Sequence, residues 1–221
     1  MAAAGALDHE ELVALVEKAT EHVNPAEPAQ EIPNPSFHTQ EKRISRDTEQ
    51  VHLCLALPGT SHTHRDRYTM ALCDTLLGGS TSSRLFQEIR ENRGLAYSIG
   101  SYSILCRNTG LFLIHAGTAN ENLSEVLGLI RAELDKLQRN GVSEEDLSQA
   151  KSHVHGSLAL ARESTSFRMQ RLANGMLYEG KVVSHRRLLH RFERISAEDI
   201  GRVAKRSFSA DPTIVALGPL E

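Results

Sequence analysis

The sequence has no apolar run of membrane-spanning length and no excess of positive charge. Its N-terminus lacks the charged-then-apolar order of a signal peptide. The formal net charge is −3, whereas a nucleic-acid-binding domain usually carries an excess of Lys and Arg clustered on its surface. We therefore predict a cytoplasmic protein that has neither a membrane nor a nucleic acid as its partner.

Cysteine is also scarce in this chain. Cys54, Cys73 and Cys106 are odd in number and well separated, so they fit neither a disulfide framework nor a CxxC metal motif. We expect these three residues to be reduced thiols in the core of a cytoplasmic protein.

A proline-rich stretch at residues 24–36 divides the chain. Residues 1–23 come before it and indicate the tail of a strand, in the first seven residues, followed by a helix. Asp8 and Glu11 form the capping-box pattern of that helix. The main unit is then residues 37–221. A chain that begins at the end of an element indicates a fragment of something longer.

The main unit follows the order of an α+β fold, with strands first, then a hairpin, then helices and a closing strand. The strand-like runs are residues 37–46, 51–57, 95–104, 110–117 and 213–218. The helical patterns are residues 65–77, 123–140, 143–158, 172–177, 188–195 and 200–208. A further short helix is expected between the first helix and the hairpin, which turns near residues 107–109.

The stretch of residues 76–104 organises the rest of the chain. Gly78 and Gly79 end an apolar helical run, and we attribute this to left-handed backbone, which glycine adopts cheaply. The hydroxyls of residues 81–83 predict the cap of a new helix. The apolar stripe of that helix consists of Leu85, Phe86 and Ile89.

This second helix ends in a tight turn that leads into a strand. Gly94 occupies the position of a helix C-terminal glycine, and Leu95 follows as its hydrophobic partner. The strand carries on one face Tyr97, Ile99 and Ser101. Arg90 and Tyr97 thus lie on two rigid elements joined by a turn, which can point both groups at one place.

Eleven histidines raise a metal hypothesis, but none of their spacings completes a site. An HE pair at residues 9–10 begins like HExxH, but Val13 stands where the second histidine is needed, and the inverted HxxEH is absent. Two HxH pairs, at residues 62–64 and 153–155, lack a third ligand at a supporting interval. His115, inside an apolar strand, is expected to be a core histidine.

Other catalytic patterns are absent or incomplete. The glycine pair follows a helix rather than a strand, and no phosphate-loop motif is present. There is no GxSxG, Cys54 and Cys73 lie in apolar runs, and residues 164–166 fit a helix cap. Arg90 and Tyr97 remain, either as ordinary surface residues or as two hydrogen-bond donors to one carbonyl or oxyanion.

The segment LGGSTSSRLFQEIRENRGLAYSIGSYS resembles the second homologous domain of the M16 family of zinc metallopeptidases. This family includes pitrilysin, insulysin and the mitochondrial processing peptidases, and the likeness is closest to its bacterial, processing-peptidase-like branch. The likeness runs from AAAGALDHEELVALVEK, which is similar to the end of the family's first domain, to the closing TIVALG strand. Residues 37–221 then resemble the C-terminal, non-zinc-binding domain, and residues 1–23 the tail of the preceding one.

The resemblance implies a two-layer α+β sandwich of the LuxS/MPP-like metallohydrolase type, in which helices cover an antiparallel-rich mixed sheet. It also implies that Arg90 and Tyr97 are the catalytic residues of this chain, which hold the substrate backbone and stabilise the oxyanion. Zinc is the implied cofactor of the complete enzyme, bound by an HxxEH motif that this chain lacks. We therefore expect no cofactor in this chain and no activity from it alone.

The implied partners are a peptide or unfolded polypeptide substrate and a zinc-bearing M16 N-terminal domain or subunit, and a dimer is compatible with this. Two alternatives stay open. One is a non-catalytic scaffold or assembly subunit of the same fold. The other is a stand-alone metal enzyme that uses the HxH pairs.

Overall fold

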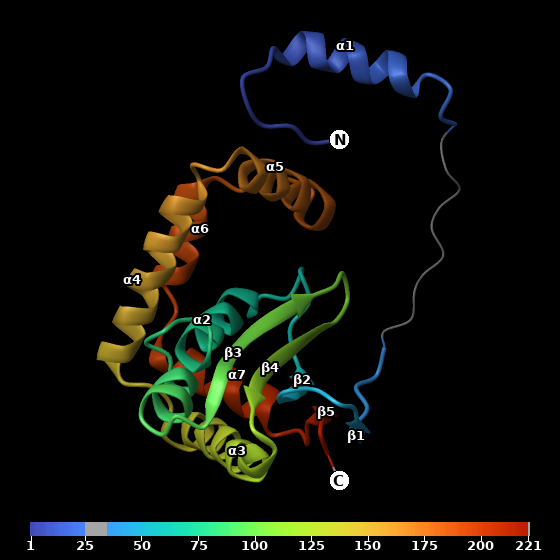
Figure 1. Ribbon diagram of the computed structural model, residues 1–221. Coiled ribbons are helices and arrows are strands. Elements are labelled where there is room, and N and C mark those ends of the chain that lie inside the picture. Colours follow the sequence, from blue (N-terminus) through green and yellow to red (C-terminus); the bar gives the residue numbers. More distant parts are fainter. Residues whose placement is uncertain (25–34, 221) are drawn as a thin grey trace.

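The computed structural model describes residues 1–24 and 35–220 (Figure 1). Most of the predicted linker, residues 25–34, lies outside the described residues. The elements are, in chain order, α1 (His9–Thr20), β1 (Glu41–Ser45), β2 (Val51–Pro58), α2 (Arg67–Leu77), η1 (Phe86–Glu91), β3 (Ala96–Leu105), β4 (Gly110–Thr118), η2 (Asn120–Asn122), α3 (Leu123–Asn140), α4 (Glu144–Ala161), α5 (Thr165–Asn174), η3 (Gly175–Glu179), α6 (His185–Glu193), α7 (Ala197–Phe208) and β5 (Thr213–Gly218).

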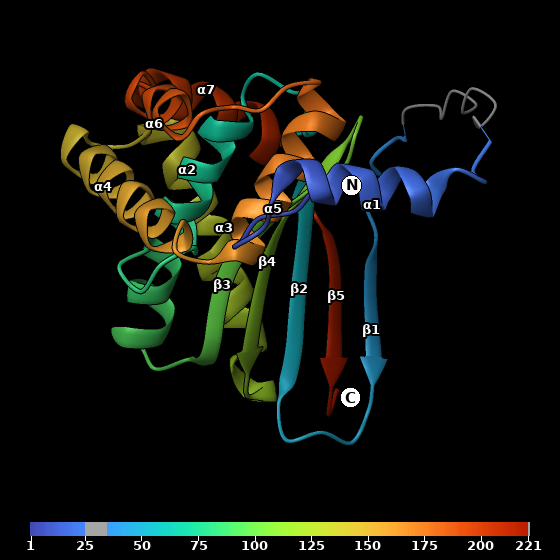
Figure 2. The same ribbon diagram turned by 90° about the horizontal axis from the view of Figure 1, so that it is seen from above.

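Five strands form one mixed sheet in the order β1-β5-β2-β4-β3. β1 and β5 run parallel, and the other neighbouring pairs are antiparallel. Figure 2 shows the strands side by side, with β1 and β3 at the two edges. The β3–β4 hairpin closes where the N–H of Cys106 donates to the carbonyl of Thr109 at 2.9 Å. The predicted hairpin and the antiparallel-rich mixed sheet are therefore confirmed.

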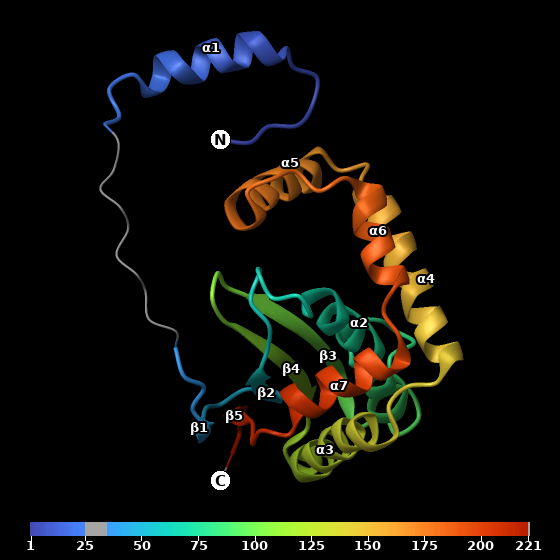
Figure 3. The ribbon, with the colours of Figure 1, turned by 180° about the vertical axis from the view of Figure 1, so that it is seen from behind.

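Helices cover one face of this sheet, because alternate residues of its strands are apolar on that side. The face includes the buried residues Val51, Leu53, Leu55, Phe112, Ile114 and Ile214. α7 packs on β2, α2 packs on β3, and α3 packs on α7. Figure 3 shows α3 and α7 lying along this side, whereas α5 stands apart from the strands on the other side. The two-layer α+β arrangement predicted above is confirmed.

Serine side chains cap the N-termini of α4, α5 and α7. Ser143 accepts a hydrogen bond from the N–H of Asp146 at 3.1 Å. Ser164, in the cap predicted at residues 164–166, accepts one from the third residue after it at 3.3 Å. Ser196 and Asp199 form a complete capping box at α7. The C-terminal end of α3 is Gly141, which has a φ of +67°. Each of these signals involves only residues close together in the sequence.

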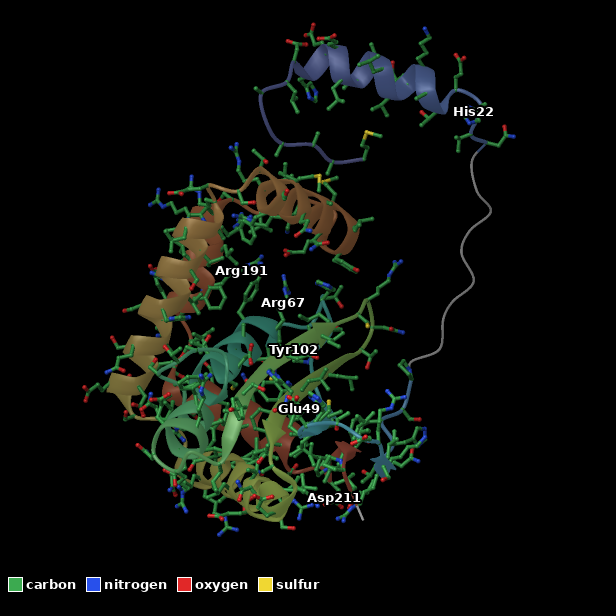
Figure 4. All side chains as sticks on the ribbon, viewed as in Figure 1. His22, Glu49, Arg67, Tyr102, Arg191 and Asp211 are labelled. Carbon is green, nitrogen blue, oxygen red and sulfur yellow. The ribbon has the colours of Figure 1, made fainter. Side chains whose placement is uncertain are left out.

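The helices α4, α5 and α6 form an arm beside the sheet (Figure 1). Glu179 of η3 joins the arm to α2, because it accepts hydrogen bonds from Arg67 at 2.6 Å and from Arg191 of α6 at 3.2 Å. Both arginines also donate to the hydroxyl of Tyr68. Figure 4 shows Arg67 and Arg191 near one another where the arm meets the sheet layer.

The N-terminal segment agrees with the prediction in part. Asp8 caps α1 by accepting a hydrogen bond from the N–H of Glu11 at 2.9 Å. The strand tail predicted for the first seven residues is wrong, because no described strand pairs with them and they form no strand. No residue of α1 is buried, so its apolar stripe is not part of the core.

The cysteines correct a second expectation. All three are free thiols, and Cys73 is buried in the core as predicted. Cys54 is half-buried, and Cys106 is exposed because it lies at the β3–β4 turn. Every helix in residues 1–24 and 35–220 is too short or too polar to span a membrane.

Candidate functional site

The glycine turn that precedes the candidate site is built differently from the prediction. Gly78 has a φ of −151°, and neither it nor Gly79 has a positive φ, so left-handed backbone does not explain the pair. A Cβ on Gly78 would lie 2.4 Å from the main-chain nitrogen of Ser101. Gly78 is therefore needed because the end of α2 lies directly against the backbone of β3.

The predicted hydroxyl cap of the next helix is also wrong. No side chain caps η1, and the side-chain amide of Gln87 instead donates to the carbonyl of Thr81 at 2.7 Å. The predicted apolar stripe is present. Leu85 and Ile89 are fully buried, and Phe86 is half-buried against the same core.

Arg90 lies in a π-helical turn. The N–H of Asn92 donates to the carbonyl of Gln87, five residues earlier, at 2.9 Å. Turns of this kind are rare, and they occur frequently at functional sites. The wide turn was not predicted, because apolar periodicity does not distinguish it from an ordinary helical turn.

The Arg90 side chain is exposed and forms no ion pair with the residues that the structure describes. Its guanidinium carbon lies 4.8 Å from the centre of the Phe86 ring. Arg93, three residues later, forms ion pairs with Glu88 at 2.8 Å and with Glu125 at 3.4 Å. By contrast, no carboxylate in the described part of the chain pairs with Arg90.

The turn after Arg90 has the geometry that the glycine predicted. The N–H of Gly94 donates to the carbonyl of Arg90 at 3.1 Å, and the N–H of Leu95 donates to the carbonyl of Ile89 at 2.9 Å. Gly94 has a φ of +65°, and its bond to Arg90 is that of a helix end closed by a left-handed glycine. The carbonyl of Leu95 also accepts a hydrogen bond from the hydroxyl of Thr118 at 2.5 Å.

Tyr97 is the extra residue of a β-bulge. Ala96 and Ser98 pair with consecutive residues of β4, so Tyr97 has no partner on that strand. Its side chain is 85% exposed, whereas Ile99 and Ser101, which were predicted to share its face, are buried. That prediction is wrong because the bulge interrupts the alternation of the strand, and bulges commonly redirect a side chain in this way.

The structure thus leaves both predicted site residues accessible. Arg90 and Tyr97 project from η1 and from the start of β3, and one capped turn joins these elements. No hydrogen bond links the two side chains within the residues that the structure describes. Their N–H and O–H groups are therefore available as donors to a ligand.

The histidines provide no metal site in the described residues, where no group of three potential ligands comes together. His115 is exposed rather than in the core, and its ring lies 5.9 Å from that of Tyr102, which is labelled in Figure 4. This expectation was wrong because His115 lies on the face of the sheet that helices do not cover. His62 of one HxH pair stacks on Tyr178 at 3.8 Å, and burial, with a smaller effect of Arg67, lowers its pKa.

A half-buried carboxyl group on α2 was not predicted. Burial raises the pKa of Asp74, and the hydroxyl of Ser101, which donates a hydrogen bond to this carboxyl group, acts in the opposite direction. Asp74 is the only acidic residue in the otherwise largely apolar α2. A single acidic residue in an apolar helix was the feature of the sequence that could have revealed this carboxyl group.

Comparison with known proteins identifies the kind of domain. Residues 1–154 match a family model described as the peptidase M16 inactive domain. An uncharacterized zinc protease of Streptomyces coelicolor is 34% identical over 229 residues, which cover 100% of this chain and 50% of that protein. An uncharacterized zinc protease of Bacillus subtilis is 34% identical over 185 residues, covering 84% of this chain and 45% of that protein. The chain thus spans about half the length of these curated relatives.

Solved structures share the fold. A peptidase M16 inactive domain from Pseudomonas fluorescens superposes with a TM-score of 0.86 at 22% identity, over 97% of this chain and 52% of that one. A protease from Helicobacter pylori superposes with a TM-score of 0.81 at 23% identity, over 97% of this chain and 54% of that one. The mixed sheet and its helical layer therefore have the arrangement found in these proteins.

Proposed function

Because this chain belongs to the M16 peptidase family, as a domain of its inactive type, we propose that it is the non-zinc half of a zinc endopeptidase. In this proposal Arg90 and Tyr97 position the substrate and stabilise the oxyanion. The observation that carries it is the exposure of an unpaired guanidinium and a bulged phenol on either side of one capped turn.

The two side chains suit the chemistry of peptide hydrolysis. When a peptide carbonyl is attacked, negative charge develops on its oxygen, and donors held in place beforehand stabilise that charge most effectively. The guanidinium of Arg90 offers several N–H donors, and the phenol of Tyr97 offers one O–H donor. The π-helical turn and the β-bulge supply the rigid positions that such donors require.

In this proposal, zinc is bound outside this chain. The side chains of the described residues do not fit a zinc site, since no three potential ligands are grouped. The HxxEH ligands are therefore assigned to a separate domain or subunit, and the isolated chain is inactive. The names of the relatives, zinc proteases about twice as long as this chain, support this division.

The proposed domain division follows from the N-terminal segment. Residues 1–23 are the tail of the zinc-bearing domain, residues 24–36 are a linker, and residues 37–221 are the M16 C-terminal domain. Apolar side chains of α1 and of the α5–η3 segment line a cavity of about 650 Å³. This uncovered apolar surface fits a contact with the remaining half of the enzyme.

Enzyme assembled from this chain and its zinc-bearing half tests the proposal. With a peptide or unfolded polypeptide as substrate, Arg90→Ala and Tyr97→Phe should each lower kcat by about 100-fold, the lower end of the loss seen when one oxyanion donor is removed. Arg93→Ala, in the turn after η1, and Tyr102→Phe, in β3, are matched controls, and both should keep near wild-type turnover.

The outcomes separate the alternatives. Full turnover in both Arg90→Ala and Tyr97→Phe would contradict the assigned roles. Cleavage by the isolated chain with one bound zinc would instead support the stand-alone metal enzyme. A wild-type assembly that forms but cleaves nothing would support the non-catalytic scaffold.

A further inference from the structure

We propose that Phe86 is a positioning residue for Arg90, holding its guanidinium by a cation–π contact while leaving its hydrogen-bond donors free. This inference rests on the proposed function of Arg90. The guanidinium carbon lies 4.8 Å from the centre of the Phe86 ring, within the range of about 6 Å in which a cation is attracted to an aromatic face.

The spacing of the two residues brings their side chains together. Phe86 and Arg90 are four residues apart in η1, a spacing at which side chains of a helix meet. The π-helical turn is compatible with this contact, since four residues still make close to one full turn.

An aromatic face suits this task better than a carboxylate. A carboxylate would accept hydrogen bonds from the guanidinium and occupy its donors, as Glu88 does for the neighbouring Arg93 at 2.9 Å. A ring attracts the charge through its face and accepts none of the N–H groups within the guanidinium plane. Arg90 is thereby restrained and remains able to donate to a substrate carbonyl.

The ring itself has a fixed base. Phe86 is half-buried and packs against the hydrophobic core, next to Leu85 and Ile89, which are fully buried. The hydrogen bonds of Gly94 and Leu95 close the helix at its other end. Both the ring and the Arg90 backbone are thus held by the fold, and only the arginine side chain extends to the surface.

Kinetics of the enzyme assembled with its zinc-bearing half tests the role of the ring. Phe86→Leu keeps an apolar side chain but removes the aromatic face, and it should lower kcat by about 2- to 5-fold with little change in KM. Phe86→Tyr keeps the aromatic face, so its kcat should stay near the wild-type value. In the Arg90→Ala background, Phe86→Leu should have no further effect, because the ring acts through the arginine.

A second measurement does not depend on activity. In nuclear magnetic resonance spectra of this chain, the side-chain N–H signal of Arg90 should show a ring-current shift that disappears in Phe86→Leu. No such shift, or an equal loss of kcat from Phe86→Leu with and without Arg90, would overturn the inference. If the shift is present but Arg90→Ala is fully active, the contact is real, and the proposed function of Arg90 fails together with the positioning role.

Discussion

The hydroxyl of Thr118 donates a hydrogen bond to the main-chain carbonyl of Leu95 at 2.5 Å. Thr118 is the last residue of β4 and is fully buried, and Leu95 lies in the turn before β3. The bond therefore fastens the turn between the two proposed site residues to the neighbouring strand.

Thr118→Val should remove this bond while keeping the shape of the side chain. We expect the free energy of unfolding to fall by about 1–2 kcal/mol, because the turn carbonyl loses its side-chain partner in a buried setting. Thr75→Val is a matched control, since the hydroxyl of Thr75 only adds to a helix by bonding the carbonyl of Ala71 at 3.0 Å. Denaturant unfolding that shows equal losses in both variants would contradict the special role of Thr118.

Gly78→Ala should be strongly destabilising. The new Cβ would lie 2.4 Å from the nitrogen of Ser101 and 2.7 Å from the carbonyl carbon of Gly100, and neither backbone can move aside easily. We expect a loss of about 2–4 kcal/mol in the free energy of unfolding. Gly128→Ala, in α3 with nothing within 4 Å of its Cβ, should instead gain about 0.5–1 kcal/mol. If thermal unfolding ranks the two variants in the opposite order, the close contact between Gly78 and the backbone of β3 is refuted.

Asp66 should make stability depend on pH in the acidic range. The guanidinium of Arg202, bonded to Asp66 at 2.8 Å, and then that of Arg206 hold the pKa of this buried carboxyl group at about 2, below its ordinary value of 3.8. Since the pKa is lowered by folding, the stabilisation is complete above the unfolded value and is lost as the pH falls from about 4 through 2. It amounts to about 2 kcal/mol.

Asp66→Asn should therefore remove that part of the acid dependence, measured by urea unfolding between pH 6 and about 2. Asp135→Asn is the control, because Asp135 is 59% exposed and lies 3.7 Å from Arg139. An unchanged pH profile in Asp66→Asn would show that the buried ion pair does not carry this dependence.

Removal of residues 1–36 should leave the main unit folded. No residue of α1 is buried, so we expect the free energy of unfolding to change by only about 0.5 kcal/mol. The truncated chain should also lose affinity for the zinc-bearing half. Ile214→Ala is the control for a defect in the core, because Ile214 is buried in β5, and it should lower the free energy of unfolding by about 2–5 kcal/mol. A loss of similar size on truncation would contradict the proposed domain division.

Features that depend on neighbours along the chain were predictable. Gly94 and Leu95 specified the helix end between Arg90 and Tyr97, because this left-handed turn uses only residues 89–95. The capping box of Ser196 and Asp199 and the hairpin before β4 were predictable for the same reason. The resemblance of residues 77–103 to a known family then singled out Arg90 and Tyr97, which spacing alone left either as ordinary surface residues or as donors to a ligand.

Features that depend on distant residues were decided by the tertiary structure. The bulge that exposes Tyr97 requires the register with β4, and the reason for Gly78 is the approach of α2 to β3. His115 is exposed because helices cover the other face of its strand, which periodicity cannot tell from this one. The sequence by itself determined most of the elements and several of their ends, and the family resemblance added the two candidate donors. Only packing between elements decided which side chains remained free, because burial is a property of the assembled layers and not of any single segment.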